Sequence, residues 1–262
     1  MTKLLEGKNA IVYGAGGGLG GGIARTFARE GARVFLAGRT RSTLEATAKD
    51  ITAAGGSADV AVVDALDETA VDRHVRDVVA AAGSVDVSIN LITRGDVQGI
   101  PIVDMTTDDL LRATVTGLTT NFVTARAAGR QMVEQGSGVI LHLNSASGAG
   151  AHPGMGSTGP ADAAVESLMR YLAAELGPQG IRVCGIWTAG VTDTLSVDKL
   201  SEVDAGQEWD PQAVEAMIAG MSVLRRAPRL ADVVEVAAFL ASDRASGVTG
   251  TMANATAGLV LR

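Results

Sequence analysis

The stretch NAIVYGAGGGLGGGIARTFAREGARVFLAGRTR, residues 9–41, decides the fold. A short apolar run over 10–13 leads into 14–22, where seven of the nine residues are glycine. A segment with helical apolar spacing follows, and a second apolar run covers 34–37. Strand, glycine turn, helix and strand in this order form the βαβ unit that binds dinucleotides. A flexible glycine linker would not be bounded by a buried strand and an amphipathic helix.

The glycines of this turn fit two spacings. Gly16, Gly18 and Gly21 match G-x-G-x-x-G, while Gly14, Gly18 and Gly20 match G-x-x-x-G-x-G. In either case the backbone can approach a pyrophosphate closely, and the helix N-terminus supplies free N–H groups. The cofactor-binding candidates in this turn are Gly14, Gly16, Gly18, Leu19 and Gly20.

Composition indicates one α/β domain. The chain has 262 residues, 47% of them apolar but only 3% aromatic, so its core must consist mainly of Ala, Val, Leu and Ile. Strand and helix patterns alternate along the whole chain, and no linker interrupts them. We therefore expect a single-domain Rossmann fold over 1–262, a doubly wound parallel sheet of about seven strands with helices on both faces.

Charge and cysteine content exclude several classes of partner. A net charge of −7 without a basic stripe argues against nucleic-acid binding. The single cysteine, Cys184, excludes an intrachain disulfide and fits a reducing compartment. No apolar run approaches the roughly 20 residues of a membrane span, and we expect no signal peptide. We expect a cytoplasmic protein with no membrane partner and no metal ion.

Two arginines follow the second apolar run, in Gly38-Arg39-Thr40-Arg41. An NAD-specific site carries Asp or Glu at this place, against the ribose 2′-hydroxyl. A guanidinium there accepts a 2′-phosphate instead and can stack on adenine, so Arg39 and Arg41 favour NADP(H) over NAD(H). The alternative is that both are solvated side chains opening a surface helix over 43–52.

The next elements place further candidates at the carboxyl edge of the sheet, where such folds bind ligands. A strand over 58–63 ends at Asp64 and Ala65, which we assign to the cofactor site. Asp64 can equally cap the following helix, 68–82. Asn90, near the end of a strand over 85–92, is expected on the same edge.

The second half continues the alternation. Helices are predicted over 107–135, 160–176 and 230–241, and strands from 139, over 181–187 and within 251–261. His142, inside an apolar strand, is interpreted as a satisfied core histidine. Asn144, Ser145 and Ser147 follow at the strand end and are better site candidates. The acidic segment 193–226 is a surface region that can also serve as a substrate lid.

These motifs together resemble the short-chain dehydrogenase/reductase family over nearly the whole chain. The resemblance rests on Gly14, Gly18 and Gly20, on Asp64 and Asn90, and on the segments VESLMRYLAAELGPQGIRV and FLASDRASGVTG. It implies an NAD(P)-dependent oxidoreductase acting on a small carbonyl or alcohol substrate. It also implies a homodimer or homotetramer built on the helices near 107–135 and 160–176. The small residues expected on their free faces are Ala127, Ala128, Ala163 and Ala173.

The family's catalytic residues are mostly absent. Its chemistry uses a Ser, a Tyr thirteen residues later as acid–base group, and a Lys four further that lowers the tyrosine pKa. Aligned on the family pattern, these positions are Ser145, Thr158 and Asp162, and the family's Asn on the long helix is Gly117. The Asn-Asn-Ala-Gly turn keeps only Asn90.

Thr158 and Asp162 also have a purely structural interpretation. Thr158-Gly159-Pro160 is typical of a helix start, with a capping Thr, a proline in the first turn and Asp162 complementing the helix dipole. His152, in the loop before this helix, has a side chain whose ordinary pKa suits a proton donor. The catalytic candidates are therefore Ser145, Thr158, His152 and Asp162, with a solvated loop as the alternative for His152.

Three functions follow from this departure. The favoured one is a divergent NADPH-dependent carbonyl reductase, in which Ser145 polarises the carbonyl and water, His152 or Thr158 supplies the proton. The alternatives are a cofactor-binding pseudoenzyme and a non-redox enzyme, such as a dehydratase or cyclase, that uses Asp162 or His152. Consumption of cofactor separates the first from the others, because fold alone does not determine function.

Overall fold

A computed structural model of the chain describes residues 3–204, 206 and 208–261. Its described residues form one seven-stranded sheet in which every pairing is parallel. The spatial order is β3-β2-β1-β4-β5-β6-β7. The first three strands extend the sheet to one side of β1 and the last four extend it to the other side, so the order of the strands reverses between β1 and β4. The strands are β1 (Asn9–Tyr13), β2 (Arg33–Gly38), β3 (Ser57–Val62), β4 (Val87–Asn90), β5 (Gly138–Ser145), β6 (Ile181–Thr188) and β7 (Met252–Asn254). This is the predicted doubly wound fold.

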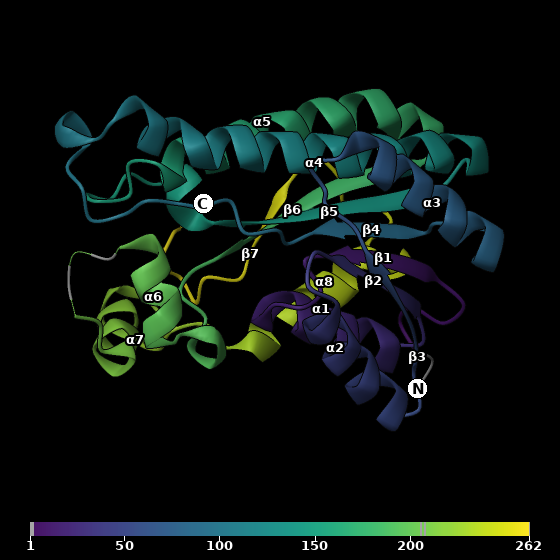
Figure 1. Cartoon of the computed structure of the whole chain (residues 1–262), viewed down its shortest axis with the longest axis horizontal. Helices are drawn as coiled ribbons and strands as arrows, with labels where there is room; N and C mark the ends of the chain where they lie inside the picture. The colour runs from purple at the N-terminus through teal and green to yellow at the C-terminus, as the bar shows by residue number, and fades with distance from the viewer. Residues whose placement is uncertain (1–2, 205, 207, 262) are drawn as a thin grey trace.

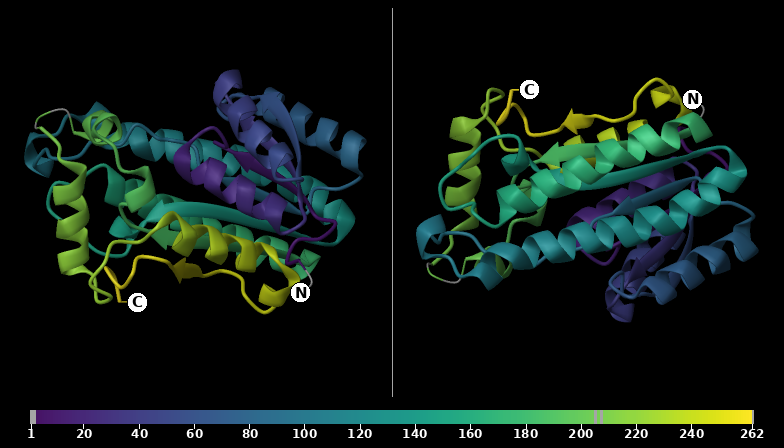
Figure 2. Two further views of the ribbon diagram at one scale, coloured as in Figure 1. Left: turned by 90° about the horizontal axis from the view of Figure 1, so that it is seen from below. Right: turned by 90° about the horizontal axis from the view of Figure 1, so that it is seen from above.

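Helices cover both faces of the sheet (Figures 1 and 2). One face carries α1 (Gly18–Arg29), α2 (Arg41–Ala53) and α8 (Leu230–Ala241). The other carries α3 (Glu68–Ala82), α4 (Thr107–Gln135) and α5 (Thr158–Leu176). The helices predicted over 68–82, 107–135 and 230–241 have the predicted bounds. The strand predicted over 85–92 is shorter, and the helix predicted from Pro160 begins two residues earlier at Thr158.

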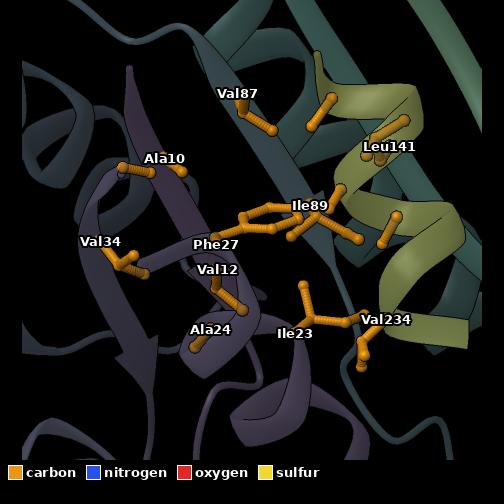
Figure 3. Packing of buried hydrophobic residues seen from close by; sticks show 14 of the residues in the cluster. Ala10, Val12, Ile23, Ala24, Phe27, Val34, Val87, Ile89, Leu141 and Val234 are labelled. Atoms are coloured by element: carbon orange, nitrogen blue, oxygen red, sulfur yellow. The ribbon is translucent and has the colours of Figure 1, made fainter. Parts of the chain in front are cut away.

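Side chains that alternate along the central strands fill two separate cores. On β1, Val12 faces the α1–α8 core, whereas Ile11 and Tyr13 face the α3–α5 core. Figure 3 shows the first core, in which Phe27 of α1 lies among residues of the sheet and of α8. Because both of their faces are buried, β1 and β2 are apolar over most of their length, as parallel strands are, whereas the edge strand β3 is largely exposed or half-buried.

The predicted lid region lies beyond the end of the sheet (Figure 1). It contains two helices, α6 (Val197–Val203) and α7 (Pro211–Met221), whose N-termini are capped by Ser196 and Asp210. Short 3-10 turns lie at Ile102–Asp104, Ala146–Gly148, Gly177–Gln179, Thr192–Thr194 and Asp243–Ala245. Among the helices described, none combines the length and the apolar character that crossing a membrane requires.

Candidate functional site

The glycine turn is shaped by backbone contacts at Gly14 and Gly20. Gly14 has φ +81°, and a Cβ there would lie 2.7 Å from the carbonyl oxygen of Leu91. A Cβ on Gly20 would collide with the carbonyl oxygen of Gly14. At Gly16, by contrast, an added Cβ would meet the side chain of Thr43. The steric requirement therefore lies at Gly14 and Gly20, which favours the G-x-x-x-G-x-G register.

Helix α1 begins at Gly18, directly above this turn. Its N-cap is Gly17, which provides no side-chain hydrogen bond, so the N–H groups of Gly18 and Leu19 have no intrahelical acceptor. These groups and the helix dipole attract an anion. Thr194 and Lys199 of the predicted lid lie next to Gly18, with the Lys199 Nζ 3.3 Å from where a Cβ would stand.

A cavity of about 250 Å³ opens beside the turn. Its wall includes five of the predicted cofactor residues, Gly14, Gly16, Arg39, Asp64 and Ala65, together with Thr93, Thr116 and Thr120. Arg39 is exposed, and no carboxylate in the described part of the chain pairs with it. Arg41 is the first residue of α2, pairs with Glu45 at 3.5 Å and does not line the cavity.

Two predicted edge residues have local structural roles. Asp64 accepts a hydrogen bond from the Leu66 N–H at 3.0 Å, and the N-cap of α3 is Asp67, so the prediction that Asp64 caps this helix is wrong. Asn90 is buried, and its amide binds Thr124 Oγ1 at 3.2 Å and the Ile92 N–H at 2.9 Å. Asn90 therefore holds the turn after β4 and does not face the cavity.

Ser145 and Asp162 meet at the carboxyl end of β5. The Ser145 hydroxyl donates to Asp162 Oδ2 at 2.5 Å, and Arg94 Nη1 lies 2.6 Å from Asp162 Oδ1. The Asp162 side chain is 0% exposed. The interpretation of Asp162 as a helix-start residue that complements the dipole is therefore wrong, because Asp162 lies after the first turn of α5 and its carboxylate is directed into the protein.

Thr158 is not the cap of α5. The N-cap is Ser157, without a side-chain cap bond, and Thr158 is the first helical residue, buried at 3% exposure. Its Oγ1 accepts a hydrogen bond from Gln98 Nε2 at 3.2 Å. Ser157 Oγ instead accepts from the Val97 N–H at 2.8 Å, which ties the loop after β4 to the start of α5.

Arg94 occupies space that the missing side chain of Gly117 leaves free. A Cβ on Gly117 would lie 2.5 Å from Arg94 Cδ. The guanidinium also binds Asp96 through Nη2 at 2.8 Å and Nε at 3.3 Å. Farther along, the Gln98 N–H donates to the carbonyl oxygen of Val203 at 2.7 Å, so this loop also contacts α6.

Burial governs the electrostatics of this cluster. It raises the pKa of Asp162 to about 6, although Arg94 and the Ser145 hydroxyl act in the opposite direction. Burial works against the charge of Arg94, yet Asp162 and Asp96 together hold the pKa of Arg94 above its ordinary value. The buried Asp162 carboxylate therefore has a positive partner that comes from another loop.

The histidines lie apart from this cluster. His152 is exposed and lines a separate groove of about 790 Å³ with residues 100–102 and 147–156. His142 is buried, as predicted, and burial lowers its pKa to about 4. Its Nε2 has no hydrogen-bond partner among the residues that the structure describes, so the prediction that it is satisfied is wrong. The nitrogen faces Gly185, where no side chain is present to bind it.

Sequence reasoning missed Arg94, Asp96 and Gln98. They lie in the loop after β4, where the chain departs from the family's Asn-Asn-Ala-Gly turn. One signal was available, because Gly117, a glycine inside a long helix, leaves room for another side chain. That Arg94 fills this room follows only from the path of the loop.

The comparisons with known proteins agree with this architecture. A family model described as enoyl-(acyl carrier protein) reductase matches residues 14–260. Galactitol 2-dehydrogenase (L-tagatose-forming) from Cereibacter sphaeroides is 31% identical over 256 residues, which are 95% of this chain and 93% of that protein.

Solved structures match over the same length. NAD+-bound xylitol dehydrogenase has a TM-score of 0.86 at 29% identity, with 97% of this chain and 99% of that chain covered. Carveol dehydrogenase from Mycobacterium avium, in complex with NAD, has a TM-score of 0.90 at 25% identity, with 100% of both chains covered. Matches that run from the glycine turn to the last strand show that the chain belongs to the short-chain dehydrogenase/reductase family, whose members are NAD(P)-dependent oxidoreductases.

Proposed function

We propose that the protein is an NADP(H)-dependent oxidoreductase that acts on a small carbonyl or alcohol substrate through a non-standard active site. The observation that supports the cofactor preference is Arg39, an unpaired guanidinium at the end of β2 on the wall of the 250 Å³ cavity. A 2′-phosphate in that cavity would receive a charge-assisted, bidentate contact from it. The two related structures named above contain NAD, so the preference for NADP(H) rests on Arg39 and not on these relatives.

The residues present fit the adenosine and pyrophosphate parts of such a cofactor. Gly14 and Gly20 let the turn pack closely against backbone carbonyl groups, Gly14, Gly16 and Gly17 line the cavity, and α1 begins beside it at Gly18 with N–H groups that have no side-chain cap. Once bound, the cofactor supplies a hydride. The chain would then bind the substrate oxygen near Ser145, which is half-buried at the end of β5.

The experiment that tests this proposal is a calorimetric titration of NADP+ and NAD+ into wild type and Arg39→Ala. We expect tighter binding of NADP+, and a loss of that preference in Arg39→Ala. NADPH oxidation would then be followed against a panel of small ketones and aldehydes. Equal affinities in the wild type would refute the cofactor preference, and tight binding without turnover would refute the reductase.

A second function, cofactor binding without turnover, is favoured by one observation. The side chains of Arg94 and Gln98 already contact Asp162 and Thr158, the two residues that the sequence pattern aligns with the family's Lys and Tyr. In that case the Thr158→Tyr/Asp162→Lys pair, combined with Arg94→Gly, would be needed to create reductase activity. Activity in the wild type decides against this alternative.

We also propose that the protein assembles as a homodimer or homotetramer through α4. Its outer face carries a continuous apolar stripe, Leu111, Val115, Leu118 and Phe122, which is exposed in the single chain. The prediction that Ala127, Ala128 and Ala173 lie on free faces is wrong, because these residues are buried against the sheet. Light scattering on wild type and Phe122→Glu tests the interface, with Val62→Glu on β3 as an exposed control. A monomeric wild type at micromolar concentration would refute it.

A further inference from the structure

We propose that Asp162 and Ser145 form a two-step proton relay to the substrate oxygen, and that Arg94 is the positioning residue that holds the relay in place. This inference rests on the proposed reductase function and names the group that replaces the family's missing tyrosine. Its basis is the arrangement of the three side chains at the end of β5.

The geometry leaves one route between the Asp162 carboxyl and the site. Asp162 Oδ1 is bound by Arg94 Nη1 at 2.6 Å, and Oδ2 is bound by the Ser145 hydroxyl at 2.5 Å. The Asp162 side chain is 0% exposed, whereas Ser145 is half-buried and reaches the carboxyl edge of the sheet. When Oδ2 carries a proton, the hydrogen bond reverses, so that Oδ2–H donates to Ser145 Oγ and the Ser145 hydroxyl hydrogen turns to the substrate; the proton then leaves through the Ser145 oxygen.

The proton transfers balance as follows. During reduction the substrate carbonyl carbon would gain a hydride, which NADPH would supply if bound, and its oxygen would take the proton of the Ser145 hydroxyl. The Ser145 oxygen simultaneously takes the proton of the Asp162 carboxyl. Asp162 ends as a carboxylate beside Arg94, and a solvent proton returns along the same route before the next turnover.

The other proton donors considered are held elsewhere. The Thr158 hydroxyl is buried and receives a hydrogen bond from Gln98. His152 is exposed on the groove formed with residues 100–102, and Ser145 is not part of the lining of that groove. Neither forms a hydrogen-bonded chain with Ser145, which Asp162 does.

The charged groups around Asp162 determine when it carries its proton. Arg94 and Asp96 face it from the loop after β4, and Glu166 lies one turn along α5, where its Oε1 accepts from Trp187 Nε1 at 2.7 Å. Asn144 Nδ2 donates to the Asp162 carbonyl oxygen at 3.0 Å and fixes the helix turn. Burial places the pKa of Asp162 at about 6, within the range suited to a general acid under mildly acidic conditions. Arg94 holds that pKa down, because a neighbouring cation favours the carboxylate.

The first test measures this pKa in the cofactor-free protein. Carboxyl-¹³C labelling of aspartate, followed by NMR over pH 3–9, should show one resonance with a midpoint near 6 that is missing in Asp162→Asn. Arg94→Gln should move the midpoint upward by roughly one to three pH units, the usual influence of an adjacent cation. Arg94→Lys should stay close to the wild type, and Arg130→Gln, an exposed arginine on α4, serves as the control. If Arg94→Gln does not fold, Arg94→Lys provides the test. An Asp162 titration midpoint in Arg94→Lys that differs from the wild-type midpoint by as much as one pH unit overturns the positioning role of Arg94.

The second test follows NADPH-dependent reduction against pH, with any carbonyl compound from the panel that is turned over. Wild-type kcat should fall as pH rises through the Asp162 midpoint, because the relay needs the protonated carboxyl. Ser145→Ala and Asp162→Asn should each lower kcat by about 10²–10⁴, the usual contribution of general acid catalysis, and should abolish this pH dependence. Ser145→Thr keeps a hydroxyl and should restore most of the rate. Arg94→Gln should shift the falling limb to higher pH by the amount measured by NMR.

The outcomes separate the relay from the function on which it rests. An Asp162 carboxyl that titrates below pH 5 overturns the relay even when the enzyme is active. Brisk turnover whose pH profile is unchanged in Asp162→Asn also overturns the relay and leaves the reductase standing. Absence of turnover in the wild type with tight NADPH binding overturns both.

Discussion

The glycine-turn half and the Ser145 half of the site differ in the kind of atoms that form them. The first is made of backbone: Gly14 and Gly20 pack against carbonyl oxygens, and α1 presents its free N–H groups. The second is made of side chains from three separate segments, namely Arg94, Ser145 and Asp162. Backbone geometry tolerates little change, whereas side chains can exchange positions and charges. The glycine half therefore depends on the path of the backbone, and the Ser145 half depends on which side chains are present.

In the Ser145 half, the charge of one buried side chain is balanced by a side chain from another loop. A buried carboxylate without a partner is costly, and Asp162 has its partner within 2.6 Å. The partner is an arginine from a different loop, and the space it crosses is free because residue 117 is glycine. Positions 94, 117 and 162 therefore behave as one unit, and single replacements within it leave a charge or a space unmatched.

The largest expected effect breaks the backbone half. Gly20→Ala should lower the free energy of unfolding by roughly 3 kcal/mol, the upper end of overpacking costs, because its Cβ would collide with the carbonyl oxygen of Gly14. Urea denaturation measures the change. Gly220→Ala on α7, which meets nothing within 4 Å, is the matched control and should be neutral or slightly stabilising. Equal free energies of unfolding for the two variants would show that the backbone of the glycine turn can shift to accommodate a Cβ, and would contradict the prediction.

The next effect isolates the burial of Asp162. Its pKa is raised from 3.8 to about 6 in the folded state, so folded protein binds this proton more tightly than unfolded protein. The associated stability is present below pH 4 and is lost as pH rises through 6, by ~3 kcal/mol in total. Asp232 and Glu30, whose pKa values are lowered, oppose this trend. The difference in unfolding free energy between wild type and Asp162→Asn should therefore change by that amount between pH 4 and pH 7, and a constant difference would contradict the prediction.

A smaller effect sharpens the role of Arg39. Arg39→Asp should place a carboxylate where NAD-specific sites have one, against the ribose 2′-hydroxyl. We expect NADP+ to bind more weakly and NAD+ more tightly, a change in their affinity ratio of about a hundredfold from the loss of one charged hydrogen bond. Calorimetry measures both. Arg41→Asp is the control, since Arg41 pairs with Glu45 outside the cavity. Similar changes of the affinity ratio in the two variants would show that Arg39 is not the specific contact of the 2′-phosphate.

The smallest effect concerns Lys199. Its ammonium lies over Gly18 at the N-terminus of α1, and no carboxylate in the described chain pairs with it. Lys199→Ala should weaken NADP+ and NAD+ binding equally, by about 0.2–1 kcal/mol, because an exposed charge acting on a pyrophosphate is screened by solvent. The loss should shrink as salt rises. A change limited to NADP+ would place Lys199 at the 2′-phosphate instead.

The sequence predicted the fold because its signals are local. Apolar runs, helical spacing and glycine turns each depend on a few neighbouring residues, and three helices have the predicted bounds. The βαβ opening and its glycines could be identified in the same way. The choice between the two glycine spacings required the tertiary structure, in which Gly14 packs against the carbonyl oxygen of Leu91 and Gly20 packs against that of Gly14.

The chemistry of the second half was decided by tertiary structure. Residue spacing identified Ser145 and Asp162 as candidates. It predicted neither the hydrogen bond between them nor the complete burial of Asp162. Arg94 lies 68 residues from Asp162 along the chain, and only the parallel order of β4 and β5 brings its loop to the start of α5. Ion pairs between separate loops leave no local pattern in a sequence, because their energy comes from desolvation and distance in the folded protein. The sequence alone determined that a dinucleotide fold is present, and the tertiary structure decided which charges face one another at its site.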